Sequence, residues 1–224
     1  MQTPLDYAAK ICYSNREVLQ FSYDMAVKYK DSPGVYVEAG VAAGAQIIAM
    51  KYGAPDKTIY AFDSFEGIPL PSNMDDQMPG IAFLSETERK ALPDPGKQVL
   101  ETSGATVVPM EDFINHIIMS GLDYKNIYAV KGWFEETIPE EAKNIGPIAL
   151  LRLDGDLYYS TYVALEHLYP KVIKGGIVII DDYALPGCRA AVLEYFGMSV
   201  PLVKLMWSGE SCVAYWERKH KGRT

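Results

Sequence analysis

The sequence contains little cysteine and little histidine. Of its 224 residues only three are cysteines, an odd number without the C-x-x-C spacing of zinc sites and redox motifs. We therefore expect neither a disulfide framework nor a structural zinc site from Cys12, Cys188 and Cys212. The three histidines have no evident partner in the sequence, so no catalytic role is predicted for His116, His167 or His220.

Long apolar runs and an excess of positive charge are also missing. No apolar run reaches the roughly 20 residues that a membrane-spanning helix needs, and the N-terminus lacks the basic start and apolar core of a signal peptide. The formal net charge is −8 and the isoelectric point is about 4.9. Binding to nucleic acid requires clustered Lys and Arg. We expect a cytoplasmic protein that binds neither membranes nor nucleic acids.

What is present is the composition of a globular protein. Hydrophobic residues make up 49% of the chain and charged residues 22%, and a chain of this length suits one domain. We expect a single domain over residues 1–224, with N-terminal helices within 1–32 and an insertion over 67–109.

The most informative stretch runs from Ile148 to Tyr183. Two apolar runs, Ile148–Asp154 and Ile177–Asp182, end in acidic residues and are typical of parallel strands buried on both faces. Between them, apolar residues recur at helical spacing, which predicts a crossover helix and two parallel strands. The start and end of this helix are assigned to Ser160 or Thr161, Pro170 and a Gly175-Gly176 turn.

Parallel strands bring these terminal acids to one edge of the sheet. Neighbouring strands lie about 4.8 Å apart, so Asp154 can meet Asp181 and Asp182 there. Crowded carboxylates raise one another's pKa unless a cation neutralises them, and a hard divalent ion such as Mg²⁺ prefers oxygen ligands. We therefore predict a metal site at these three aspartates. The alternative is that each acid only caps a helix or faces solvent.

A second βα unit lies in the first half of the chain. Val35–Val37 predicts a short strand, and a turn from Glu38 to Gly44 leads into a helix over Ala45–Tyr52. Glycines permit a tight turn and close approach of a ligand, and the helix start offers free N–H groups to an anion. The spacing E-x-G-x-A-x-G differs from the G-x-G-x-x-G dinucleotide fingerprint, so a plain βα turn is the alternative.

The next predicted strand, Thr58–Phe62, also ends in an acid. In doubly wound folds a carboxylate at the end of the second strand binds the ribose diol of a nucleoside, and Asp63 occupies that position. The alternative is that Asp63 caps the following turn together with Ser64.

Residues 67–109 interrupt the regular pattern. The segment carries six prolines and little periodicity, apart from Ser85–Glu88, a capping-box sequence that predicts one short helix. A segment of this length beside a ligand-binding edge is more often a lid than a connector. We predict a lid over the substrate, with a disordered insertion as the alternative.

The remaining elements complete an α/β pattern. Helices are expected over 4–30 (one or two), 111–120 and 187–196, and strands over 126–131, 202–206 and 211–216, the last two as a hairpin. The 111–120 helix is expected to face inward with Phe113, Ile114, Ile117 and Ile118. Gly132 and Trp133 follow the 126–131 strand, where they could flank a purine base or belong to the core.

The sequence resembles the macrocin O-methyltransferase (TylF-like) family in five phrases that span about residues 33–217: VYVEAGVAAGA, IYAFDSFEGIP, VKGWFEETIP, LLRLDGDLYYST and LYPKVIKGGIVIIDDY. Members of this family are S-adenosylmethionine-dependent enzymes that methylate hydroxyls on antibiotic sugars and related natural products. The acid pattern also resembles that of the cation-dependent catechol O-methyltransferases.

The resemblance implies a class I methyltransferase (Rossmann-like) sheet of seven strands, in the order 3-2-1-4-5-7-6 with the seventh strand antiparallel and helices on both faces. It also implies positions for the site residues: Glu38, Gly40 and Gly44 near the methionine moiety, Asp63 and Ser64 near the ribose, Gly132 and Trp133 near the adenine, and Asp154, Asp181 and Asp182 as Mg²⁺ ligands. The sequence departs from the family at Ala42-Ala43, where a bulkier, often basic pair is usual, and in its short N-terminal region.

These features predict an S-adenosylmethionine- and Mg²⁺-dependent O-methyltransferase acting on a sugar, vicinal diol or phenol of a small natural product. A metal-coordinated hydroxyl has a lowered pKa, methyl transfer needs in-line positioning, and Asp154 or Asp156 would accept the proton. The alternatives are a nucleotide-dependent oxidoreductase, which the missing fingerprint disfavours, and a catalytically silent cofactor-binding relative. Homo-oligomers are common among such enzymes, and this state stays open.

Overall fold

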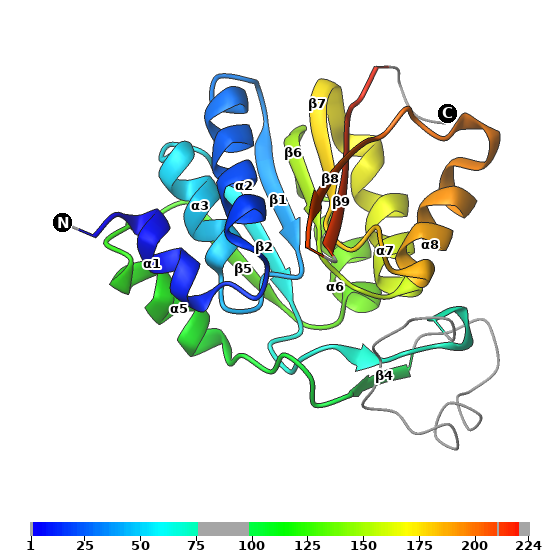
Figure 1. The fold of residues 1–224 in the computed structure, drawn as a ribbon, viewed down its shortest axis with the longest axis horizontal. Helices are drawn as coiled ribbons and strands as arrows, with labels where there is room; N and C mark the ends of the chain where they lie inside the picture. Colours follow the sequence, from blue (N-terminus) through cyan, green and yellow to red (C-terminus); the bar gives the residue numbers. More distant parts are fainter. Residues whose placement is uncertain (1, 76–98, 210, 220–224) are drawn as a thin grey trace.

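A seven-stranded, mostly parallel sheet forms the centre of the molecule (Figure 1). The computed structural model describes residues 2–75, 99–209 and 211–219. The strand order is β5-β2-β1-β6-β7-β9-β8, and β9 runs antiparallel to both neighbours. Their bounds are β1 Val35–Ala39, β2 Ile59–Asp63, β5 Ile127–Lys131, β6 Ile148–Leu153, β7 Val172–Ile180, β8 Lys204–Ser208 and β9 Ser211–Glu217. Counted within this sheet, the order is the 3-2-1-4-5-7-6 that the family resemblance implies, and that prediction is confirmed.

Burial explains why these segments form strands. Every residue of β6 is buried, as a parallel strand covered on both faces requires. Along β1, neighbouring side chains point to opposite faces, so Tyr36 belongs to one apolar core and Val37 to the other. Two cores therefore flank a single sheet.

Helices cover both faces of the sheet (Figure 1). One face carries α1 Pro4–Ile11, α2 Arg16–Tyr29, α3 Ala45–Gly53 and α5 Met110–Met119, and the other carries α6 Phe134–Glu141, α7 Tyr158–Leu168 and α8 Pro186–Phe196. The expected 4–30 region is thus two helices, and Thr3 and Asp6 form a capping box at the start of the first. Among the described residues, no helix combines the length and the apolar character needed to cross a bilayer.

The structure corrects the expected boundary between the crossover helix and the second acid-tipped strand. The prediction of a Gly175-Gly176 turn is wrong, because both glycines lie within β7. The pairing of β7 with β6 shifts register between Ile148 and Leu150, and Gly175 has a φ of +81°. The glycines therefore mark an irregularity inside a strand, which is a common place for glycine in a sheet.

The predicted cap of α7 is also wrong. The helix begins at Tyr158, so Ser160 and Thr161 are buried within it. A different segment supplies the cap, since Asp75 Oδ1 accepts the backbone N–H of Tyr158 at 2.8 Å. A carboxylate at a helix start pairs with free N–H groups and with the positive end of the helix dipole. This contact ties the beginning of the 67–109 segment to α7.

Three smaller differences complete the comparison. Helix α6 and a two-stranded hairpin, β3 Pro69–Leu70 with β4 Val99–Thr102, are not predicted from the sequence. Pro139 lies inside α6 and weakens its helical signal. Ile118, expected to face inward, is 56% exposed, whereas Phe113 and Ile117 are fully buried. The predicted helix at 85–88 lies outside the described residues, as does much of the predicted lid.

Candidate active site

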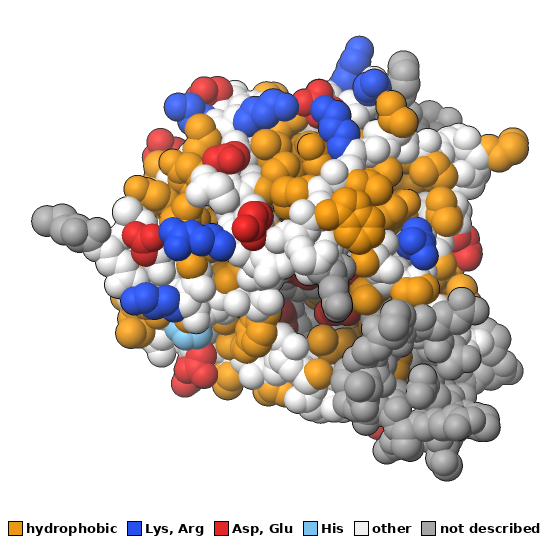
Figure 2. Space-filling view, in the orientation of Figure 1, with side chains coloured by type: hydrophobic (Ala, Val, Ile, Leu, Met, Phe, Trp, Pro, Cys, Tyr) orange, Lys and Arg blue, Asp and Glu red, His pale blue; other side chains and the backbone are white. Residues whose placement is uncertain are grey.

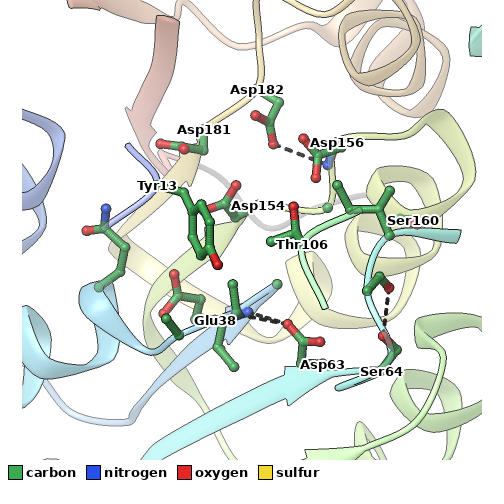
Figure 3. A pocket seen from close by; sticks show the side chains of 18 of the residues that line it. Tyr13, Glu38, Asp63, Ser64, Thr106, Asp154, Asp156, Ser160, Asp181 and Asp182 are labelled. Carbon is green, nitrogen blue, oxygen red and sulfur yellow. Dashed lines mark hydrogen bonds between the residues drawn. The ribbon is translucent and has the colours of Figure 1, made fainter. Parts of the chain in front are cut away.

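The carboxyl ends of β1, β2, β6 and β7 open into a cavity of about 260 Å³. In Figure 2 the surface is hollowed below the strand ends, and acidic side chains are visible in the hollow. Two of the site residues predicted from the sequence, Gly44 and Gly132, lie in the surrounding turns but do not line the cavity. The others line it: Glu38, Gly40, Asp63, Ser64, Trp133, Asp154, Asp181 and Asp182 (Figure 3).

Gly40 allows the end of β1 to approach the end of β6. Its φ is +94°, and a Cβ at this position would lie 1.7 Å from the carbonyl oxygen of Asp154. The N–H of Asp154 donates in turn to Ala39 O at 2.8 Å. Only glycine combines this backbone conformation with the absence of a side chain. The turn after β1 therefore depends on a glycine at position 40.

Helix α5 supports the same turn from behind. A Cβ on Gly44, whose φ is +84°, would lie 2.8 Å from the ring of Phe113. His116 Nδ1 lies 3.0 Å from Ala43 O, a partner that is not evident from the sequence. The histidine does not line the cavity, and no catalytic role is assigned to it.

Asp63, at the end of β2, fastens the glycine turn. Its Oδ2 accepts the backbone N–H groups of Val41 and Ala42, each at 2.9 Å, and its Oδ1 accepts that of Phe65 at 2.7 Å (Figure 3). Asp63 therefore caps the turn that follows β2, which is the alternative role considered in the sequence analysis. The Ser64 hydroxyl donates to the carbonyl oxygen of Gly67 in the same turn. Because each carboxylate oxygen can accept about two hydrogen bonds, Oδ1 keeps capacity for one further donor.

The three predicted metal ligands converge. One carboxylate oxygen from each of Asp154, Asp181 and Asp182 lies within 4.8 Å of the others. The strand register explains this, because Leu153 and Ile180 are partners across β6 and β7 and the acids follow them directly. Asp182 also accepts the backbone N–H of Asp156 at 3.2 Å (Figure 3).

A residue that the sequence reasoning missed, Arg152, lies among these acids. It is on β6 and has no exposed surface. Its Nη1 donates to Glu38 Oε1 at 2.8 Å and to Asp154 Oδ2 at 2.5 Å, and its Nη2 lies 2.7 Å from Asp181 Oδ1. The signal in the sequence is a single arginine inside an otherwise apolar strand. Such a residue is buried only with counter-charges.

One arginine does not neutralise this many acids. Burial raises the pKa of Glu38 to about 8 even though Arg152 opposes the shift, and burial raises the pKa of Asp181 to about 6. Burial and neighbouring carboxylates raise the pKa of Asp156 to about 8 and hold that of Asp182 well above its ordinary value. The site therefore holds more carboxyl groups than Arg152 can pair as carboxylates, and added cations would favour their ionised forms.

Two buried carboxylate oxygens of this cluster lack a hydrogen-bond donor within the described part of the chain: Glu38 Oε2 and Asp181 Oδ1. Arg152 Nη2 is close to the second oxygen but does not meet it with hydrogen-bond geometry. Unpaired buried carboxylate oxygens destabilise a protein. An ammonium group at Glu38 and a divalent cation at the aspartates would pair them, so these residues fit a cationic cofactor and a metal ion.

The sequence model of the macrocin-O-methyltransferase (TylF) family matches residues 18–218. The chain belongs to this family. The resemblance noted in the sequence is thereby confirmed, and the TylF-family match covers the strands that carry the cavity together with most of α2 and the helices α3 to α8.

Individual relatives agree with this assignment. Over 185 residues the TylF-family chain is 35% identical to the 8-demethyl-8-(2,3-dimethoxy-alpha-L-rhamnosyl)-tetracenomycin-C 4'-O-methyltransferase of Streptomyces olivaceus, covering 79% of this chain and 64% of that one. Over 194 residues it is 35% identical to the mycinamicin III 3''-O-methyltransferase of Micromonospora griseorubida, covering 83% and 69%. The chain thus spans about two thirds of the length of these relatives.

The solved structure of the O-methyltransferase NovP has a similar fold. The TM-score is 0.69 at 29% sequence identity, over 92% of this chain and 81% of that one. Together with the sheet order, this similarity shows that the TylF-family chain has a class I methyltransferase fold.

Further residues of this TylF-family site come from segments that the sequence reasoning did not single out. The loop between α1 and α2 contributes Cys12, Tyr13 and Ser14 to the cavity wall, and the Ser14 hydroxyl donates to Asp181 Oδ2 at 3.3 Å. Tyr13 and Asp154 both line this cavity (Figure 3). Glu135, at the start of α6, also lines the cavity and has a buried Oε1 without a partner in the described chain.

Proposed function

We propose that this protein is an S-adenosylmethionine-dependent O-methyltransferase that uses Mg²⁺ or a similar divalent cation and methylates a hydroxyl of a small natural product. The observation that carries the proposal is the convergence of a buried carboxylate, Glu38, with three aspartates at one edge of the sheet, around an arginine that cannot balance them all. Membership of an O-methyltransferase family supports the reaction type.

The proposed cofactor position is the crevice outside the carboxyl ends of β1, β2 and β5, the usual ligand position in open α/β sheets. Glu38 would pair with the ammonium group through its unpartnered Oε2, and Asp63 would accept a ribose hydroxyl. Gly40 leaves the backbone of the turn accessible. Gly132 and Trp133 would flank the adenine. Cationic groups of the cofactor suit a site with more carboxyl groups than cationic side chains, because they favour the ionised carboxylates.

Asp154, Asp181 and Asp182 would hold the divalent cation, which lowers the pKa of a coordinated hydroxyl. Of the two candidate proton acceptors, Asp156 is favoured over Asp154. Asp154 Oδ2 is engaged by Arg152 at 2.5 Å, whereas Asp156 lines the cavity and has no salt bridge within the described chain. Asp156 would take the hydroxyl proton while the oxygen attacks the methyl carbon and the carbon–sulfur bond breaks.

The acceptor is proposed to be a hydroxyl on a sugar or a related vicinal diol. The two sequence relatives are named for methyl transfer to a rhamnosyl tetracenomycin and to mycinamicin III. Tyr13, which lines the cavity together with Asp154 (Figure 3), offers a ring and a hydroxyl to such an acceptor. The absence of nucleic-acid and membrane partners, the cytoplasmic location and a homo-oligomeric state stay predictions.

Methyl transfer from labelled S-adenosylmethionine tests the proposal. The purified protein is incubated with rhamnosylated natural products and Mg²⁺, and the methyl gain is followed by mass spectrometry. Transfer should stop when the metal is chelated and return when Mg²⁺ is added. Transfer that persists in metal-free protein would contradict the metal role. Binding of S-adenosylhomocysteine with no transfer to any acceptor would favour the silent relative, and nicotinamide binding detected by fluorescence would favour the oxidoreductase.

A further inference from the structure

The guanidinium of Arg152 contacts both the proposed cofactor side and the proposed metal side of the site. Its Nη1 donates to Glu38 on β1 and to Asp154 after β6, and its Nη2 faces Asp181 after β7. We propose that Arg152 is a positioning residue that couples cofactor binding at Glu38 to metal binding at Asp154 and Asp181. The inference rests on the proposed function, because it requires that both ligands bind.

A shared nitrogen is the physical basis of the coupling. Glu38 Oε1 and Asp154 Oδ2 accept from the same Nη1, so a ligand that reorients Glu38 changes the hydrogen bond that Asp154 receives. The guanidinium is planar and rigid, and any rotation of its plane also moves Nη2 relative to Asp181. Glu38 and Arg152 are direct partners across β1 and β6, and both are fully buried. Neither side chain can relax into solvent.

The charges of the cluster and the immobilisation of the guanidinium predict that the cofactor and the metal strengthen each other's binding. Glu38, Asp154 and Asp181 surround one arginine, so the cluster has three carboxyl groups for one cationic side chain. An ammonium group at the unpartnered Oε2 of Glu38 would keep that carboxylate ionised and hold the guanidinium in one plane. The aspartate oxygens on the other side are then held in place for the metal. Bound cofactor should tighten metal binding, and by reciprocity the metal should tighten cofactor binding.

A purely structural role is the competing explanation, because a buried ion pair that loses one partner destabilises a fold strongly. That role predicts a loss of stability on substitution and no link between the two ligands. Arg152→Lys separates the two explanations. Lysine keeps the positive charge but presents a single ammonium group in place of the planar fork. The variant preserves the charge balance and removes the simultaneous contact with Glu38 and Asp181.

The experiment uses Mn²⁺ as the metal probe and S-adenosylhomocysteine as the cofactor probe. Mn²⁺ dissociation constants are measured by electron paramagnetic resonance, with and without saturating S-adenosylhomocysteine. The matched control is Arg16→Lys, since Arg16 pairs with Asp6 on the surface and its side chain is 71% exposed. In wild type and in the control, S-adenosylhomocysteine should tighten Mn²⁺ binding at least about fivefold, the lower end of ordinary allosteric coupling. In Arg152→Lys this factor should fall below about two.

Equal tightening in wild type and in Arg152→Lys, or no tightening in wild type, would overturn the inference and leave the proposed function intact. Failure of wild type to bind Mn²⁺ or S-adenosylhomocysteine would overturn both. If Arg152→Lys does not fold, as judged by circular dichroism, Glu38→Gln serves as the second variant. It removes the charge that Nη1 shares with Asp154 while keeping the side-chain shape. The coupling should fall in this variant too, and unchanged coupling would refute the inference.

Discussion

Individual charged residues decide what this site can bind. Arg152 is fully buried among carboxylates from three strands, and two oxygens of this cluster have no hydrogen-bond donor in the described chain. Buried charge is destabilising unless it is paired. The free protein therefore holds more carboxyl groups at the strand ends than Arg152 can pair as carboxylates. This imbalance explains why the cluster suits cationic ligands.

Replacing Asp181 by asparagine should abolish metal-dependent turnover, with a loss of at least about 100-fold, because one ligand of the cation loses its charge. In the absence of metal, S-adenosylhomocysteine affinity should change less than about fivefold, since Asp181 lies on the metal side of Arg152. Mn²⁺ binding, methyl transfer and calorimetry with S-adenosylhomocysteine measure these effects. Asp112→Asn, on the exposed first turn of α5, is the control. Undiminished turnover in Asp181→Asn would refute the metal role.

The stability of the ligand-free protein should fall as the pH rises from about 5 to about 8. Burial raises the pKa of Glu38 to about 8 in the folded state, whereas the unfolded carboxyl titrates near 4.3. Between these values the folded state binds more protons than the unfolded state, so the contribution of Glu38 to stability is present at low pH and is lost as the pH rises through the folded pKa. Urea unfolding at several pH values measures this slope.

The matched variant for the pH experiment is Glu38→Gln, which removes the titrating group and keeps its shape. Its unfolding free energy should depend less steeply on pH than that of wild type over the same interval. An unchanged slope in Glu38→Gln would show that other carboxylates of the cluster carry the effect.

At the scale of elements, the site depends on how closely the ends of β1 and β6 approach. Gly40 and Asp154 are in backbone contact there, and Asp63 binds the same turn from β2. Helix α7 is held by a carboxylate from a distant segment, Asp75. The strand ends and turns around the cavity are thus joined by one close backbone approach and by carboxylates that bind backbone N–H groups.

Gly40→Ala should lower the free energy of unfolding by more than about 3 kcal/mol, because the added Cβ adds a severe clash to an unfavourable backbone conformation. It should also abolish S-adenosylhomocysteine binding. Gly104→Ala is the matched control, since Gly104 has a φ of +81° and nothing within 4 Å of an added Cβ. Backbone strain alone should cost about 1 kcal/mol there. Equal losses in the two variants, measured by urea unfolding, would show that the close approach is unimportant.

At the scale of the whole molecule, one sheet separates two apolar cores. The strands contribute side chains to both cores, and helices from both halves of the chain pack against them (Figure 1). If the sheet unfolds, both cores are exposed to solvent together, because they share its strands. The predicted single domain over 1–224 therefore implies unfolding as one cooperative unit.

Urea unfolding of the protein should show coincident transitions by far-UV circular dichroism and by tryptophan fluorescence. Circular dichroism reports on the backbone, whereas fluorescence reports on the cavity and on a core, because Trp133 lines the cavity and Trp216 lies in a core. S-adenosylhomocysteine at about 100 times its dissociation constant should stabilise both transitions by about 2.7 kcal/mol. A separate, earlier fluorescence transition would contradict the single-domain prediction.

The prediction from sequence succeeded where the signal lies within one short stretch, and it failed where the structure depends on a residue or strand that is distant in the sequence. The apolar runs of β6 and β7 and the acids that follow them are contiguous in the chain, so their meeting could be anticipated. The Gly175-Gly176 turn was inferred from residue type alone, but pairing with β6 extends the strand through it. Arg152 was missed because an arginine inside an apolar run reveals its role only when its counter-charges are known.

The sequence by itself determined the family and the acids at the strand ends, because strand-end chemistry and family phrases are read within short stretches, and the order of the strands followed from the family resemblance. Only the tertiary structure decided that Arg152 joins Glu38 to Asp154 and Asp181, and that Asp75 caps α7. Glu38 and Arg152 are 114 positions apart, and Asp75 and Tyr158 are 83 apart. The physical reason is that such contacts depend on which strands become neighbours and in which register, which no single stretch of the chain contains.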